Sequence, residues 1–204
     1  DYPGRSRHSA AAAIAALGRP GMFSDSDQPA TKRWDTLRGE IVGSTLPRVV
    51  LSSEFLADAT SDQIGPLLDQ VRRPNVHVVI TLRPLVRIVP SHWQQSIQSG
   101  VRWSYDQWLH AMLDDDGNRA LNPSFWHRHR HDQLVARWAE VGGPENLTVI
   151  VLDSKNPDLV LTSFERIVGL AAGTLVAPED LTNRSLTWPE VEALRAFNSS
   201  LIDT

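Results

Sequence analysis

Three short apolar runs alternate along the chain with longer segments in which apolar residues recur every three or four positions. Short runs rich in Val, Ile and Leu are typical of buried strands. They lie at residues 48–51 (RVVL), 76–82 (VHVVITL) and 147–152 (LTVIVL). Because the runs are apolar almost throughout, we expect a sheet that is covered on both faces.

The periodic segments around these runs predict helices. Their expected ranges are residues 30–42, 61–71, 84–99, 105–113, 123–141, 158–168 and 189–201. Strands that alternate with helices favour a parallel α/β sheet between helical layers. Three strands are few for this many helices, since sheets commonly contain about five or six strands. We therefore expect the sheet to lack at least its first strand.

Individual residues explain several of the expected boundaries. Gly142, Gly143 and Pro144 should end the helix predicted for residues 123–141. Thr187 and Glu190 have the spacing of a capping box in front of the last helix. Residues 170–183 mix Ala, Gly, Pro and acidic side chains without any period, which predicts a surface loop.

The length of 204 residues and the 41% hydrophobic content fit one domain covering residues 1–204. We expect this domain to be incomplete at its N-terminus, because the chain begins at Asp1, without Met, in the middle of a pattern. The apolar stretch at residues 10–17 is too short to span a bilayer. The chain has no cysteine, which excludes disulfides and thiolate chemistry and fits a cytoplasmic protein.

The formal net charge of −4 provides no general attraction to nucleic acid or to an anionic membrane. We therefore expect neither as a partner, and any anion site should be a local cluster of arginines.

The most informative stretch is residues 81–93 (TLRPLVRIVPSHW). Arg83 should lie at the carboxyl end of a strand, where open α/β sheets bind ligands, and Pro84 should begin a helix. A guanidinium can bind phosphate with two hydrogen bonds, and the Ser91 hydroxyl should lie two turns along the same helix. Pro90 should kink that helix. An ordinary strand-to-helix turn with Arg83 paired to a carboxylate accounts for the spacing equally well.

An Arg at a strand end, followed by Pro and then by Ser eight positions after the Arg, resembles the 3′-phosphate-binding motif of sulfotransferases that use 3′-phosphoadenosine 5′-phosphosulfate. Residues 91–109, residues 125–138, the strand at residue 147 with Asp153, and residues 183–186 (NRSL) look like bacterial members of this family. The resemblance implies a three-layer α/β/α fold with a central parallel sheet of the P-loop NTPase type.

The resemblance also implies an enzyme that moves a sulfuryl group from 3′-phosphoadenosine 5′-phosphosulfate to a hydroxyl or amine of a small molecule or glycan. Arg83 and Ser91 would hold the ribose 3′-phosphate, and a loop with Arg184 and Ser185 would close over the nucleotide. No metal is implied. The chain departs from the family in one respect, because it contains no glycine-rich loop for the 5′-phosphosulfate. A noncatalytic nucleotide-binding remnant and a kinase-like phosphotransferase are therefore the alternatives.

Sulfuryl transfer also needs a base that accepts the proton of the acceptor hydroxyl. Glu54 follows the run at residues 48–51 and should project into the same crevice as Arg83, so it is the first candidate. His92 and His131 are the alternatives. A favourable negative charge at a helix N-terminus would explain Glu54 without catalysis.

Two further groups of side chains have both a functional and a structural explanation. His127, His129 and His131 invite a metal site, but the HExxH order is absent and Arg128 and Arg130 would repel a cation, so we expect no metal. Large aromatic side chains gather in the middle of the chain and either line an apolar acceptor pocket or fill the core. They are Trp93, Trp103, Trp108, Phe125 and Trp126.

Overall fold

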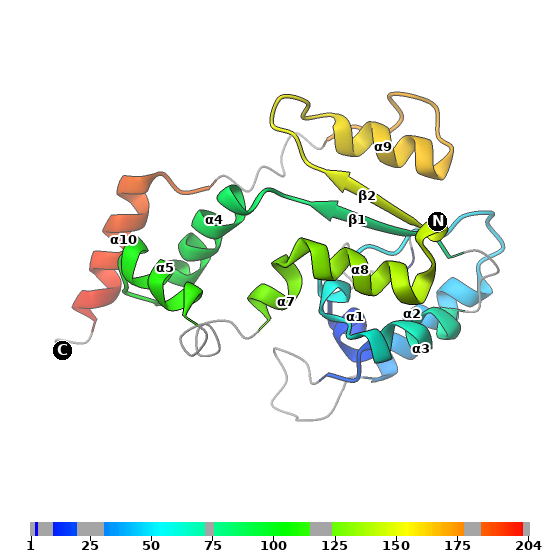
Figure 1. Cartoon of the computed structure of the whole chain (residues 1–204), viewed down its shortest axis with the longest axis horizontal. Coiled ribbons are helices and arrows are strands. Elements are labelled where there is room, and N and C mark those ends of the chain that lie inside the picture. Colours follow the sequence, from blue (N-terminus) through cyan, green and yellow to red (C-terminus); the bar gives the residue numbers. More distant parts are fainter. Residues whose placement is uncertain are drawn as a thin grey trace. The chain divides into compact units, whose positions relative to one another are not determined.

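The computed structural model describes residue 3 and residues 10–19, 31–71, 76–114, 124–177 and 185–201. Most of the regular backbone in these ranges is helical, and two parallel strands form a small sheet (Figure 1). This confirms α/β character with parallel strands. The chain divides into two compact units, which we call unit 1 (residues 1–80 and 127–149) and unit 2 (residues 81–126 and 150–204). A single domain stays a prediction.

The sheet pairs β1 (Val78–Leu82) with β2 (Leu147–Val151). At the carboxyl ends of the strands the Leu152 N–H donates to the Leu82 carbonyl at 2.8 Å. The strands predicted within residues 76–82 and 147–152 are confirmed. The strand predicted at residues 48–51 is wrong, because these residues have no regular secondary structure. Apolar composition suits a strand, but a ladder also needs a neighbouring strand, and none among the described residues pairs with this run.

Helices and short 3₁₀ turns make up most of the described part of unit 1. They are α1 (Ala10–Ala16), α2 (Thr31–Gly43), η1 (Glu54–Asp58), α3 (Ser61–Val71), α8 (His131–Gly142) and η2 (Pro144–Asn146). Buried apolar residues recur at helical spacing on α2, α3 and α8, as the patterns predicted. They are Trp34, Leu37, Ile41, Ile64, Leu67, Leu134 and Trp138. The sequence reasoning did not anticipate α1, although alanine has the highest intrinsic helix propensity.

The single helix predicted for residues 123–141 is wrong. Two helices, α7 (Phe125–His129) and α8, meet at Arg130, whose ψ of 83° lies outside the helical range. One Arg137 nitrogen donates to the carbonyl of His127 at 3.1 Å, which satisfies an acceptor that the break leaves free. Gly143 ends α8 with a φ of 85°, as predicted.

Unit 2 contains α4 (Leu85–Gln98), α5 (Tyr105–Leu113), α9 (Leu159–Val168) and α10 (Trp188–Ser200). The predicted capping box is confirmed, since the Thr187 N–H donates to the Glu190 carboxylate at 2.7 Å. The helices α4, α5 and α10 enclose one buried apolar cluster with the first residue of α7. Its fully buried members are Trp93, Ile97, Trp108, Met112, Phe125 and Val191. No helix among those described is long and apolar enough to cross a membrane.

A buried acid on α9 organises the loop that follows it. Glu165 is 3% exposed, and its carboxylate accepts hydrogen bonds from the N–H groups of Gly173 at 3.1 Å and Leu175 at 2.7 Å. Residues 170–177 form the described part of the predicted surface loop, and most of them are exposed. The remainder of that prediction lies outside the described residues.

We expect Glu165→Ala to loosen this loop without unfolding α9. Hydrogen exchange at the amides of Gly173 and Leu175 should accelerate by roughly 10- to 100-fold, because each loses a bond to a charged acceptor. Exchange followed by NMR measures the effect. Glu140→Ala, at an exposed position on α8, is the control and should leave both amides unchanged. Equal acceleration in Glu165→Ala throughout unit 2 would show general unfolding instead.

Candidate functional site

Arg83 directly follows β1 and precedes α4 by two positions, as predicted. Its side chain is exposed, and no described residue forms a hydrogen bond or ion pair with it. The alternative in which Arg83 is paired to a carboxylate is therefore not seen in the described part of the chain. All five N–H donors of this guanidinium remain available to an anion.

The N-terminus of α4 adds a second source of positive potential beside Arg83. Pro84 occupies the N-cap position, no side chain caps the helix, and its first turn contains no acidic residue. The first N–H groups of a helix have no partner within the helix and carry a partial positive charge. An anion at the end of β1 would thus meet both a guanidinium and unpaired backbone donors.

Ser91 lies on the same face of α4 as Arg87 and Gln94, because residues three and four positions apart align along a helix. Its side chain is half-buried, and its hydroxyl has no partner among the described residues. The helix α4 continues through Pro90. The helix face that carries Arg87, Ser91 and Gln94 therefore extends from the first turn of α4, next to Arg83, to the second half of the helix.

Ser185 belongs to a segment that is attached to the same face of α4. The Gln94 side-chain amide donates to the carbonyl of Leu186 at 3.1 Å, and the Leu186 side chain packs against the buried cluster of unit 2. Ser185 itself is exposed. Arg184, the remaining residue predicted to bind the nucleotide, lies outside the described residues.

Glu54, the first candidate for the base, is the first residue of η1 and is exposed. Ser53 precedes it in extended conformation and makes no side-chain cap. Glu54 belongs to unit 1 and Arg83 to unit 2. A crevice shared by the two side chains stays a prediction.

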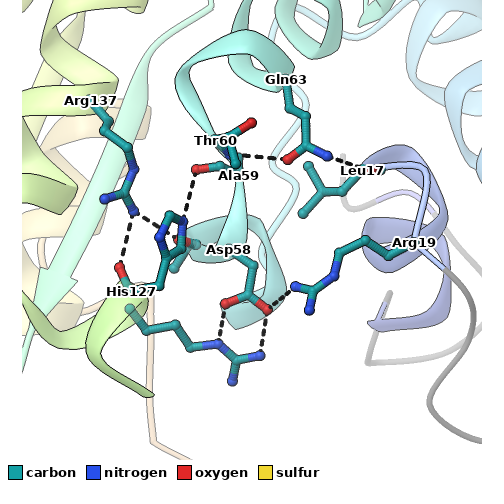
Figure 2. A network of polar contacts seen from close by, with 10 residues as sticks. Leu17, Arg19, Asp58, Ala59, Thr60, Gln63, His127 and Arg137 are labelled. Carbon is teal, nitrogen blue, oxygen red and sulfur yellow. Dashed lines mark hydrogen bonds and ion pairs between the residues drawn. The ribbon is translucent and has the colours of Figure 1, made fainter. Parts of the chain in front are cut away.

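The most extensive polar network in the described part of unit 1 surrounds Asp58, the last residue of η1 (Figure 2). The Asp58 side chain is 3% exposed. Arg128 donates to both carboxylate oxygens, with Nε 2.5 Å from Oδ1 and Nη2 2.6 Å from Oδ2. Arg19 Nη1 donates to Oδ2 at 2.8 Å. The hydrogen bond to Asp58, and the nearby charge of Glu54, raise the pKa of Arg128.

Arg137 extends this network across the adjoining backbone. Its Nη2 donates to the carbonyls of Ala57 at 3.3 Å and His127 at 3.1 Å, and burial lowers its pKa. These contacts join η1 to α7 and α8, while Arg19 joins η1 to the segment after α1. The network is a structural clamp, since both oxygens of the carboxylate are already occupied by guanidinium groups.

Sequence reasoning missed Asp58 because it lies between two similar acids, Glu54 and Asp62, in no distinctive pattern. The arginines gave no indication either, because Arg128 has an acid at i+4, Asp132, and Arg137 has one at i+3, Glu140.

The histidines do not support a metal site. His127 and His131 are four positions apart but lie on different helices, α7 and α8, so they do not share one helix face. Among the described residues no three His, Asp or Glu side chains gather where they could hold a metal ion.

The two alternative candidates for the base are His131 and His92. Burial lowers the pKa of His131. His92 packs against Trp108 and Phe125, with ring centroids 5.8 and 4.9 Å apart.

Most of the central aromatic residues fill the core. Trp93, Trp108 and Phe125 are fully buried, and Trp126 donates its indole N–H to the Met112 carbonyl at 2.8 Å. Trp103 differs, because 43% of it is exposed.

Comparisons with protein-family models, with curated proteins and with solved structures found no match for this chain. The function therefore has to be argued from the site itself.

Proposed function

We propose that the chain forms part of a sulfotransferase that moves a sulfuryl group from 3′-phosphoadenosine 5′-phosphosulfate to a hydroxyl or amine. In this proposal the parallel strands belong to the central sheet of a three-layer, P-loop NTPase-like fold. The observation that carries the proposal is Arg83, which has no partner among the described residues and stands between the carboxyl end of β1 and the uncapped N-terminus of α4.

The proposed donor site assigns a separate task to each residue. Arg83 binds the ribose 3′-phosphate with two parallel hydrogen bonds. Ser91 donates its hydroxyl to the same phosphate from the aligned face of α4. Ser185 lies on the segment that Gln94 attaches to α4, and it borders the nucleotide together with Arg184. The nucleotide is a co-substrate, and no metal takes part.

Transfer needs two further elements. The 5′-phosphosulfate requires a cradle of backbone N–H groups, and no glycine-rich phosphate loop occurs among these 204 residues. We propose that residues outside this sequence supply it. The exposed side chains of Val149 and Val151 on β2 are consistent with a sheet face that a further layer covers, since parallel sheets are normally covered on both faces. Glu54 remains the proposed base, because both carboxylate oxygens of the neighbouring acid Asp58 already accept hydrogen bonds from guanidinium groups.

The role of Arg83 has a direct test in calorimetric titration with 3′-phosphoadenosine 5′-phosphate. Arg83→Ala should weaken binding by roughly 10- to 150-fold, equivalent to about 1.5–3 kcal/mol for a hydrogen bond to a charged group. The Arg83 side chain is exposed and forms no hydrogen bond or ion pair with a described residue, so the variant should fold normally.

Two controls make this test specific for the 3′-phosphate. Adenosine 5′-phosphate, which lacks that group, should bind wild type and Arg83→Ala equally. Arg166→Ala, at an exposed position on α9, should leave both affinities unchanged. Unchanged affinity of Arg83→Ala for the bisphosphate would refute the proposed donor site.

One observation favours a kinase-like phosphotransferase as a second candidate. Asp153 follows β2 at the same edge as Arg83, and only its Oδ1 is engaged among the described atoms, by the N–H of Lys155 at 2.9 Å. A strand-end Asp is a common magnesium ligand in P-loop phosphotransferases. Nucleotide binding that requires Mg²⁺ and is lost in Asp153→Asn would favour this candidate, whereas binding undiminished by a chelator would favour the sulfotransferase.

A further inference from the structure

The loop between α4 and α5, residues 99–104, is held rigidly through its backbone. Asn198 of α10 donates its side-chain amide to the carbonyls of Ile97 at 2.7 Å and Val101 at 3.1 Å. Further side chains donate to the next two carbonyls, Arg195 to that of Arg102 at 3.2 Å and the Trp93 indole to that of Trp103 at 3.1 Å. Ser104 then begins α5 with a capping box.

The side chains of Arg102 and Trp103 take no part in this scaffold. Both are exposed, and Trp103 presents 43% of its surface to solvent. Neither side chain forms a hydrogen bond, ion pair or ring contact with a described residue. A large planar ring and a guanidinium are thus both exposed on a loop whose backbone carbonyls are held by side-chain hydrogen bonds.

These two residues line an open hollow of about 270 Å³ together with Gly100 and Val101. The hollow lies beyond the C-terminus of α4, whereas Arg83 lies before its N-terminus. A helix of 14 residues spans roughly 20 Å at 1.5 Å per residue. The hollow is therefore separate from the proposed donor site.

We propose that this hollow binds a small acid in which a carboxylate is attached to a six-membered ring. The indole face of Trp103 packs against the ring, and Arg102 binds the carboxylate with two hydrogen bonds. The fixed loop reduces the entropy lost on binding. The volume suits a single ring, and the net charge of −4 disfavours a long nucleic acid.

Aromatic acids and sugar acids both carry a carboxylate on a six-membered ring, and an NMR titration shows which of the two classes binds. The chain has seven tryptophans, so its indole N–H region should show seven signals, and Trp103→Phe identifies the one from Trp103. D-glucuronate and 4-hydroxybenzoate are titrated separately, each beside its uncharged counterpart, glucose or 4-hydroxybenzyl alcohol. We expect one of the two acids to shift the Trp103 signal in a saturable way, with the other six signals unchanged.

Arg102→Gln tests the role of charge. It should weaken binding of the acid about tenfold, to the affinity of the uncharged counterpart, as expected for one charge-assisted interaction. Both variants should fold, because the loop bonds use the backbone carbonyls of residues 102 and 103. Phe197→Ala, another exposed aromatic position, should have no effect. The proposal fails if neither acid shifts the Trp103 signal selectively, or if Arg102→Gln binds the acid as well as wild type does.

Discussion

Asp58→Ala should lower the free energy of unfolding by about 3–5 kcal/mol, the range for removing one partner of a buried ion pair. The substitution leaves Arg128 with neither of its two carboxylate contacts and removes the ion pair of Arg19. It therefore removes the ion pairs that link η1 to the segment after α1 and to α7, while the bonds of Arg137 to the carbonyls of Ala57 and His127 remain. Urea unfolding followed by circular dichroism measures the change.

Two comparisons separate this clamp from a general effect of removing acids. Glu54→Ala, at the exposed start of η1, should change stability by no more than about 0.5 kcal/mol. Arg128→Ala and Asp58→Ala should be strongly non-additive, because either one already breaks the central pair. A loss below about 1 kcal/mol for Asp58→Ala would mean that desolvation cancels the attraction, and the clamp would not stabilise unit 1.

Trp93→Ala should destabilise unit 2 by about 3–5 kcal/mol, as expected for truncating a large buried aromatic side chain. Trp93 is fully buried, and its ring lies 5.4 Å from Tyr105 and 5.0 Å from Trp188. Its indole N–H is also the donor that holds the Trp103 carbonyl. The same urea experiment, with tyrosine and tryptophan fluorescence, measures the loss.

Trp108 provides a matched control within the same cluster. It is equally buried, but its indole nitrogen has no hydrogen-bond partner among the described residues. Trp108→Phe removes an unsatisfied donor, whereas Trp93→Phe removes a made hydrogen bond and leaves a carbonyl without its donor. Trp93→Phe should therefore cost about 1–2 kcal/mol more than Trp108→Phe. Equal costs would show that the hydrogen bond to the loop contributes nothing.

Helices with strong periodicity were predictable because their residues contact mainly neighbours in sequence. The range predicted at residues 61–71 coincides with α3, and the range at residues 105–113 coincides with α5. The capping box at Thr187 and the helix end at Gly143 were also predicted from local residues. Both rest on bonds between groups a few positions apart.

The position of Arg83 in the candidate site was predictable from the sequence, but the contacts that attach distant segments to α4 were not. The order strand, Arg83, Pro84, helix follows from the pattern alone, and the structure adds that Arg83 has no partner in the described residues. The connection of Leu186 to Gln94 joins residues 92 positions apart. No local pattern carries that information.

The sequence by itself determined most of the helical segments, where two parallel strands lie, and that an arginine stands at the end of the first. Only the tertiary structure decided that residues 48–51 remain without a strand partner, that the helix after Phe125 breaks at Arg130, and that Asp58 is the buried acid rather than Glu54. The reason is the range of the interactions. Periodicity and capping involve residues that are close in sequence. Strand pairing depends on contacts between residues far apart in sequence, and so does the ion pair between Asp58 and Arg128, which are 70 positions apart.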